Sequence, residues 1–291
     1  MKPVVAVFAD LTDRTMGMVE FAQAAEARGF GGIFLNEHTH LPVSHPTSQF
    51  PAGGEIPERY ARFWDPYIAL SFVAAVTALE IGTAISLIAE HDPIQLGHAT
   101  ATLDHLSGGR LVLGVGWGWH REEYADHGRR PEERAQVVEE WVHVLRSMWR
   151  DEVASYAGRY VTLSPSYCWP KPLQSGGPPV LLGAKPTERN FARIARFADG
   201  WITDGSPVEA KSLFEQVSQL RAHWSDAGRR AEDLRISVVH NPQPGALPLH
   251  EVVAVAADCG IERVLQHIYE GDRDAMLRRL DRAATDLRAV T

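Results

Sequence analysis

Residues 96–119, LGHATATLDHLSGGRLVLGVGWGW, hold one complete unit of the fold. Apolar residues recur there at spacings of three and four, which predicts an amphipathic helix: Leu96, Ala99, Leu103 and Leu106. The Ser-Gly-Gly turn at 107–109 ends this helix, and the apolar run 110–115 predicts a buried strand. Helix, tight turn and buried strand in this order are typical of a parallel α/β protein.

The same alternation runs through the whole chain. Strands are predicted at 4–9, 31–35, 80–88, 110–115, 179–182, 200–203, 235–240 and 263–268, each followed by a helical pattern. Eight such pairs predict a closed (β/α)8 TIM barrel, in one domain spanning residues 1–291. An open doubly wound sheet would want a glycine-rich turn after its first strand, and Asp10-Leu11-Thr12 is not one.

Two stretches interrupt the rhythm and are predicted as insertions. Residues 39–63, after the second strand, are polar and proline-dotted; residues 151–178, after the fourth helix, suggest a hairpin and loop. Loops of this length in a compact domain are usually functional. We expect both insertions to cover the substrate.

The amino-acid composition argues against some classes of binding partner. Hydrophobic residues make up 45%, which is ordinary for a globular protein, and a net charge of -8 argues against nucleic-acid or anionic-membrane surfaces. The two cysteines, Cys168 and Cys259, have no CxxC spacing. The N-terminus lacks a signal-like apolar run, and no segment approaches the roughly 20 apolar residues of a membrane span. We expect a soluble cytoplasmic protein.

In a TIM barrel the site lies at the C-terminal ends of the strands. Four groups of candidate residues occupy such ends: Glu37 and His38; Ala84, Ile85 and Ser86; Gly116, Trp117, Gly118 and Trp119; Gly183, Ala184 and Lys185. Glu37 and His38 are predicted as an acid/base pair, since histidine titrates near neutrality and a carboxylate can orient it. Lys185, just before a helix N-terminus, suggests an anion site.

His38 and His40 also form an H-x-H pair, which is typical of metal-dependent hydrolases on this fold. The pair follows the second strand, and the eighth strand ends Gln266-His267-Ile268 without an aspartate. A metal-dependent hydrolase is therefore kept as a remoter alternative.

Several motifs together resemble the luciferase-like monooxygenases and their deazaflavin-dependent relatives. They are Ala25-Glu26-x-x-Gly29-Phe30, Glu37-His38, Asp65-Pro66, Ile81-Gly82-Thr83-Ala84-Ile85, Leu103-Asp104-x-Leu106-Ser107-x-Gly109-Arg110, Leu113-Gly114-Val115-Gly116-x-Gly118-Trp119 and Ala198-Asp199-Gly200-Trp201. The resemblance extends over residues 1 to 205, and the last third matches only in its strand–helix rhythm.

This resemblance implies a coenzyme lying across the barrel mouth, with coenzyme F-420 favoured and FMN as the alternative. It implies a non-prolyl cis peptide around Ala84-Ile85-Ser86 and a proton-handling role for His38. Gly116 to Trp119 would flank the ring, and Gly183 to Lys185 would take the phosphate. The glucose-6-phosphate dehydrogenase branch has a glutamate where this chain has Trp119, so we expect an apolar or aromatic substrate.

The favoured activity is hydride transfer between C5 of F-420 and a small organic substrate. The alternatives are a monooxygenase that uses reduced FMN and oxygen with a separate coenzyme reductase, and a barrel that binds coenzyme without turnover. Proteins of the family that this sequence resembles are often dimers, so we expect a homodimer.

Overall fold

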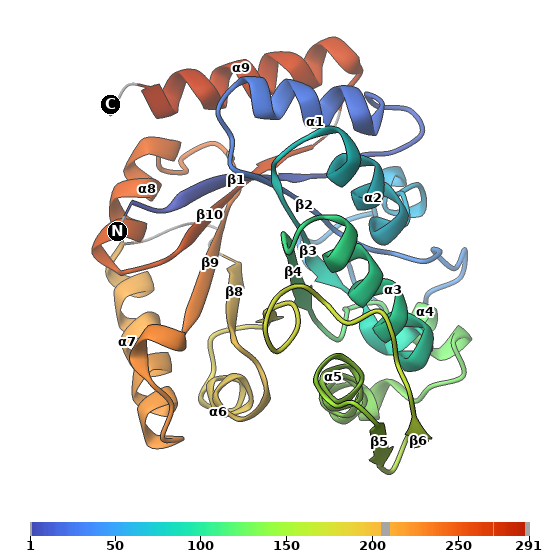
Figure 1. Cartoon of the computed structure of the whole chain (residues 1–291). Helices are drawn as coiled ribbons and strands as arrows, with labels where there is room; N and C mark the ends of the chain where they lie inside the picture. The colour runs from blue at the N-terminus through green and yellow to red at the C-terminus, as the bar shows by residue number, and fades with distance from the viewer. Residues whose placement is uncertain (1, 205–209, 270, 289–291) are drawn as a thin grey trace.

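The computed structural model describes residues 2–204, 210–269 and 271–288. Its strands form a closed parallel barrel in the order β1-β10-β9-β8-β7-β4-β3-β2, surrounded by helices (Figure 1). The strands are β1 (Val4–Ala9), β2 (Gly32–Leu35), β3 (Glu80–Ser86), β4 (Leu111–Val115), β7 (Val180–Gly183), β8 (Gly200–Asp204), β9 (Arg235–His240) and β10 (Arg263–Ile268). The predicted (β/α)8 barrel is confirmed, while the prediction of a single domain stays a prediction.

The outer helices follow the predicted order. They are α1 (Met18–Ala27), α2 (Pro66–Val76), α3 (Pro93–Leu106), α5 (Arg134–Arg150), α6 (Glu188–Phe197), α7 (Ala210–Asp226), α8 (Leu249–Asp258) and α9 (Arg273–Arg288). Asp-Pro begins both α2 and α3: Asp65 accepts from the Ile68 amide at 2.9 Å, and Asp92 from the Gln95 amide at 2.9 Å. Each aspartate satisfies an amide that lacks a partner in the first turn, and each proline fits the first helical position.

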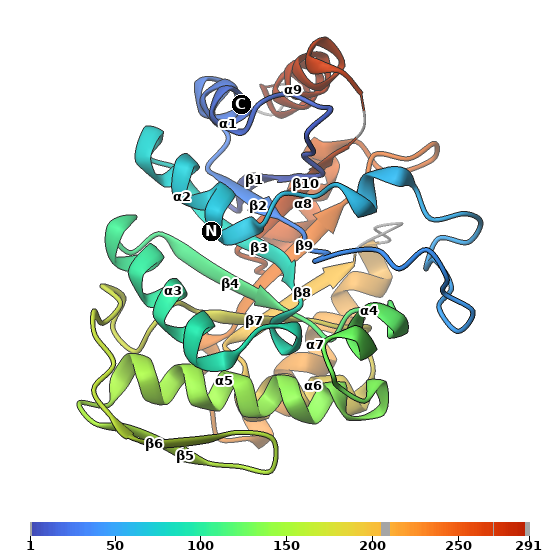
Figure 2. The ribbon, with the colours of Figure 1, turned by 90° about the vertical axis from the view of Figure 1, so that its right-hand side faces the viewer.

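Both insertions lie where they are predicted. Residues 36–65 form a long excursion between β2 and α2, which contains the 3-10 turn η1 (Glu58–Ala61). The segment after α5 contains the antiparallel hairpin β5 (Ala154–Ala157) and β6 (Thr162–Ser166). The short helix α4 (Arg121–Asp126) is not predicted from the sequence. It follows β4 and lies on the side toward which the strand arrows point (Figure 2).

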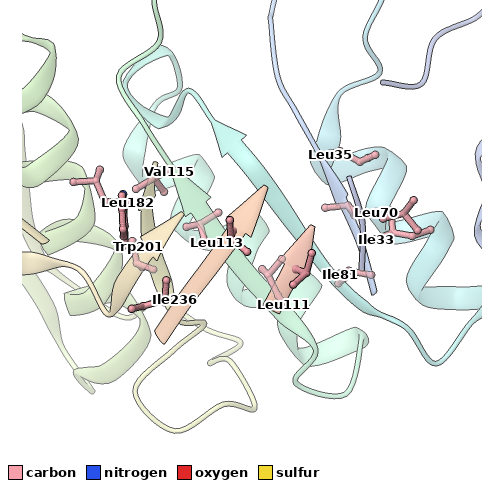
Figure 3. Close-up of a cluster of buried hydrophobic side chains, with 14 of the residues drawn as sticks. Ile33, Leu35, Leu70, Ile81, Leu111, Leu113, Val115, Leu182, Trp201 and Ile236 are labelled. Atoms are coloured by element: carbon pink, nitrogen blue, oxygen red, sulfur yellow. The ribbon is translucent and has the colours of Figure 1, made fainter. Parts of the chain in front are cut away.

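The hydrophobic core has two layers because successive side chains of a strand face opposite sides. The outer layer packs between strands and helices, and Figure 3 shows part of it, from Ile33 and Leu35 of β2 to Trp201 of β8. The inner layer fills the barrel with Ala6, Phe34, Ala84, Val112, Leu181, Ile202 and Leu265. The barrel is thus packed throughout, which leaves its rim for chemistry. Within the described residues, no helix has the length and apolar character to cross a membrane.

A buried charged cluster closes the end of the barrel opposite the predicted site. Arg263, at the start of β10, is 1% exposed and forms a two-pronged ion pair with Glu80 of β3, at 2.6 and 2.7 Å. It also donates to Ser237 of β9 at 2.8 Å, and its guanidinium lies 5.3 Å from the ring centroid of Phe34 in β2. One arginine therefore ties four strands together.

Replacing this arginine is expected to weaken the barrel. Arg263→Ala leaves the Glu80 carboxylate without its partner, and we expect the free energy of unfolding to fall by about 3 kcal/mol. Arg196→Ala is the control, because Arg196 forms a similar two-pronged pair with Glu139 but is 54% exposed. It should cost less than about 1 kcal/mol. Urea unfolding at neutral pH measures both, and equal losses would contradict the bracing role of Arg263.

Candidate active site

The predicted site residues gather at one end of the barrel. Because all the strands are parallel, the residues after β2, β4 and β7 and the last residues of β3 share the same rim. In Figure 2 the strand arrows point toward this rim, where α4 and the long loop after β2 lie. The clustering expected from the strand ends is therefore present.

The end of β3 is irregular. The Ala84–Ile85 peptide bond is cis, where the family resemblance placed one, and the β3–β4 register shifts between Thr83 and Ser86. The Ile85 side chain fills space left by two glycines: a Cβ on Gly116 would lie 2.0 Å from Ile85 Cδ1, and one on Gly183 would lie 2.4 Å from Ile85 Cγ2. These glycines admit a side chain, and their contact with a coenzyme stays a prediction.

Glu37 is a buried anchor. Its carboxylate accepts from the Ser86 hydroxyl, the Leu87 amide and His91 Nε2, each at 2.6 Å. Burial opposes the charge on Glu37, but the hydrogen bonds from His91, Ser86 and Leu87 outweigh it and hold the Glu37 pKa below its ordinary value. The predicted pairing of Glu37 with His38 is wrong, because the carboxylate turns to the end of β3. Ser86 is likewise buried and engaged, since it also accepts from the Tyr67 hydroxyl at 2.7 Å.

His38 pairs with the carboxylate of Glu123 and not with that of Glu37. Its Nδ1 donates to Glu123 Oε2 of α4 at 2.5 Å, and the two side chains are 5% and 0% exposed. A carboxylate oxygen accepts, so a proton on Nδ1 completes this hydrogen bond, and Nε2 is the nitrogen that does not face Glu123. Within the described part of the chain Nε2 has no hydrogen-bond partner. This is the arrangement of a histidine base oriented by an acid.

Aromatic rings surround this histidine. The ring centroids of Tyr60, Trp119 and Phe63 lie 5.3, 5.4 and 6.2 Å from that of His38. Phe50 packs on Tyr60 at 5.2 Å and on Trp119 at 5.8 Å. Three of these four rings come from the insertion after β2, which therefore supplies most of the apolar wall.

The other predicted residues divide between the rim and the core. Trp117 packs against the outer core, and the Arg193 guanidinium of α6 lies 5.3 Å from its ring centroid. Gly118 has a φ of 63°, which suits glycine in the turn after β4. The Ala184 carbonyl accepts from Trp201 Nε1 at 2.8 Å, and Lys185 is exposed just before α6. Phosphate binding by Gly183 to Lys185 stays a prediction.

Glu90 adds a third buried acid to the site. Its side chain is 3% exposed. Burial, with the negative charges of Glu123 and Glu37 beside it, raises the pKa of Glu90 to about 9. Glu90 is therefore neutral at pH 7, while Glu37 is ionised.

The two residues of the H-x-H pair bind carboxylates. His38 contacts Glu123, and His40 Nε2 lies 3.0 Å from Asp126 Oδ2. Across residues 2–204, 210–269 and 271–288, no group of three or more His, Cys, Asp or Glu side chains is arranged to hold a metal ion. The hydrolase alternative gains no support from this geometry.

Comparison with known proteins places this site in a family. A family model described as luciferase-like monooxygenase matches residues 9–245. The chain belongs to the luciferase-like monooxygenase family. Members of this superfamily are oxidoreductases and monooxygenases.

Two similar sequences are an uncharacterized protein and an F-420-dependent enzyme. An uncharacterized Mycobacterium tuberculosis protein is 38% identical over 95% of both chains. An F-420-dependent glucose-6-phosphate dehydrogenase of Amycolatopsis mediterranei is 30% identical over 66% of this chain and 54% of that protein.

Solved structures show the same fold at low identity. An F-420-dependent secondary alcohol dehydrogenase with an F-420-acetone adduct has a TM-score of 0.77 at 17% identity, and covers 100% of both chains. A riboflavin lyase with modified FMN and riboflavin has a TM-score of 0.74 at 14% identity, over 99% of this chain and 92% of that one.

Several site residues were not singled out from the sequence as functional. Glu123 follows the Gly116–Trp119 motif by only four residues, but its pairing with His38 joins residues 85 positions apart. Tyr60 and Phe63 lie in an insertion whose path has no local periodicity. Glu90 follows the third strand, and nothing local shows that it is buried beside two other acids.

The pKa of Glu90 gives a stability prediction with a definite sign. Between the ordinary value of 4.5 and about 9, the folded state keeps a proton that the unfolded chain releases. Stability contributed by Glu90 therefore falls as pH rises through this window. Glu90→Gln removes the titration, so the variant should match the parent at about pH 5 and exceed its stability by about 1–3 kcal/mol at about pH 8.

Calorimetric melting across this range tests the prediction. Glu132→Gln is the control, because Glu132 is an exposed acid. A hydrogen bond from its own amide and the paired Arg121 hold the Glu132 pKa below its ordinary value. That variant should show no gain in stability as pH rises. A Glu90→Gln protein less stable than the parent at the upper pH would contradict a neutral Glu90.

Proposed function

We propose that this protein is a coenzyme F-420-dependent oxidoreductase that transfers a hydride between C5 of the coenzyme and a small organic substrate. The observation that carries the proposal is the His38–Glu123 pair, in which a nearly buried imidazole keeps one nitrogen unpartnered at the barrel rim. The F-420-dependent relative and the F-420-dependent structural neighbour support this coenzyme over FMN.

The residues at the rim suit a flat coenzyme with an anionic tail. Ile85 is partly buried at the β3 bulge and offers an apolar surface, while Lys185 offers a positive charge before α6. When bound, the deazaflavin would accept or supply the hydride. The role of the protein is then to hold the substrate and to move one proton.

His38 is the proposed proton carrier. In the oxidising direction Nε2 would take the proton from a substrate hydroxyl while the hydride leaves the carbon. Glu123 fixes the tautomer by accepting from Nδ1 and stabilises the imidazolium that forms. Glu37 acts at one remove, by securing the end of β3 next to His38.

The aromatic wall indicates the substrate class. Tyr60, Phe63 and Trp119 present ring faces and edges around His38. Such a wall favours an apolar or aromatic body carrying one hydroxyl or carbonyl group. We therefore propose a hydrophobic alcohol or its carbonyl partner as substrate.

The alternative within the same family is a monooxygenase that uses reduced FMN and oxygen. It is favoured by the family model itself and by the FMN-containing riboflavin lyase. This alternative would need a separate reductase. That reductase, the homodimer and the cytoplasmic location stay predictions.

Coenzyme choice is tested by binding. F-420 and FMN are titrated separately against the protein, with coenzyme fluorescence as the signal. We expect micromolar or tighter binding for F-420 and at least about tenfold weaker binding for FMN. Tighter binding of FMN would move the protein to the monooxygenase class.

Lys185 gives a second binding prediction. Lys185→Ala should weaken F-420 binding about tenfold, because the ammonium would pair with the phosphate. Lys211→Ala, which removes an exposed charge from α7, should leave the affinity unchanged. Equal affinities of the two variants for F-420 would contradict a phosphate site at Lys185.

The role of His38 is tested by turnover of secondary alcohols and aldehydes with F-420. His38→Ala should lower turnover by about 10²–10⁴-fold while F-420 still binds, because proton transfer is lost. His223→Ala is a matched control, since His223 also contacts a carboxylate, that of Glu188 at 2.6 Å, but does so between the outer helices α6 and α7. Unchanged turnover in His38→Ala would refute the assignment.

A further inference from the structure

The Nδ1 atom of His38 begins a chain of hydrogen bonds that leads away from the aromatic wall formed by Tyr60, Phe63 and Trp119. From Nδ1 the chain passes to the Glu123 carboxylate, whose other oxygen accepts from the Thr39 amide at 2.8 Å. The Thr39 hydroxyl lies 3.3 Å from that same oxygen. Thr39 follows His38 directly in sequence, and both residues contact the buried carboxylate of Glu123.

The Thr39 hydroxyl is a junction between the interior and the surface. It lies 2.8 Å from His127 Nε2 and 3.0 Å from His40 Nδ1. The far nitrogen of His40 lies 3.0 Å from Asp126 Oδ2, and these two side chains are 41% and 62% exposed. An unbroken line of polar atoms therefore runs from a buried imidazole to solvent.

The opposite edge of His38 faces the aromatic wall. Tyr60, Phe63 and Trp119 enclose it, and these rings limit access of water to Nε2 once a substrate occupies the rim. A base that gains a proton at each turnover must lose it before the next. The line through Thr39 offers the exit.

The charges along the line permit transfer. Burial, and the neighbouring His40, hold the pKa of His127 below its usual range, so His127 is neutral at pH 7 and can accept a proton. Glu123 and Asp126 act on His127 in the opposite direction, and His91 in the same one. Glu90, 3.6 Å from His127 Nε2, is itself neutral and places no fixed charge beside the line.

We propose that His38 exchanges its proton with solvent through a relay formed by Glu123, the Thr39 hydroxyl and the surface histidines His40 and His127. The relay rests on the proposed function of His38 as proton carrier. Thr39, His40 and His127 are positioning residues in this scheme, because none of them contacts the reacting atoms.

Each transfer balances. When Nε2 takes the substrate proton, His38 becomes an imidazolium. Its Nδ1 proton then moves to Glu123 Oε2, and the neutral carboxyl turns to pass that proton to the Thr39 oxygen, while the Thr39 hydroxyl proton moves to His127 or His40 and on to water. His38 is left neutral with its proton on Nε2. After the product leaves, that proton is lost to water at the rim and one proton returns along the relay to Nδ1, which restores the starting tautomer. One proton has entered from the substrate and one has left to water, and no electrons move along the relay. In the reducing direction the same steps run backwards.

The relay is tested without substrate or coenzyme, by the exchange of the His38 Nδ1 proton with water. The full-length protein is labelled with ¹⁵N-histidine, the His38 signal is assigned by its loss in His38→Gln, and the exchange rate is measured by NMR. Thr39→Val keeps the shape and the backbone contact with Glu123 but removes the hydroxyl. We expect exchange at least about tenfold slower than in the parent.

Two further variants make the result specific. Thr39→Ser restores a hydroxyl and should restore the parental rate, while His40→Phe with His127→Phe should slow exchange as Thr39→Val does. Exchange in Thr39→Val as fast as in the parent, or faster, would overturn the relay. Because this readout needs no turnover, the relay and the proposed function can fail separately: unchanged turnover in His38→Ala refutes the function, and unchanged exchange in Thr39→Val refutes the relay.

Discussion

The buried carboxylate of Glu37 is the contact on which the rim of the barrel depends. Glu37 lies two residues after the end of β2, and its carboxylate accepts three hydrogen bonds from the segment that ends β3 and continues to His91. A charge taken out of water is tolerated only when its acceptor sites are filled, so this carboxylate fixes the two strand ends against each other. The next residue, His38, is held by that fixed backbone and meets Glu123 from the other side.

The two ends of the barrel use buried charge differently. At the closed end the charges balance, since Arg263 meets Glu80 and adds Ser237. At the rim three acids, Glu37, Glu90 and Glu123, lie close together and one of them is kept neutral. Like charges close together reduce the stability of the fold. They also raise the pKa of Glu90, so that this carboxyl keeps a proton at neutral pH. The first cluster stabilises the barrel, and the second suits proton chemistry.

The geometry also changes the meaning of several predicted residues. Gly116 is predicted to flank the coenzyme ring and Gly183 to take the phosphate, and both glycines also leave space that the Ile85 side chain fills. Trp117 and Trp119 are two residues apart, yet one packs toward α6 and the other against His38. In a strand, residues two positions apart face the same side. These two do not, because β4 ends at Val115 and the chain turns at Gly118, whose φ is 63°.

The sequence by itself determined the barrel, its two insertions and the rim at which Glu37 and His38 lie. These follow from hydrophobic periodicity, helix caps such as Asp65 and Asp92, and parallel connectivity, all of which are local properties of the chain. Tertiary structure alone decided that His38 pairs with Glu123 rather than with its neighbour Glu37, and that Tyr60 and Phe63 wall the site. Those contacts depend on the shifted register of β3 and on the path of a long loop, and both are fixed only when the barrel closes.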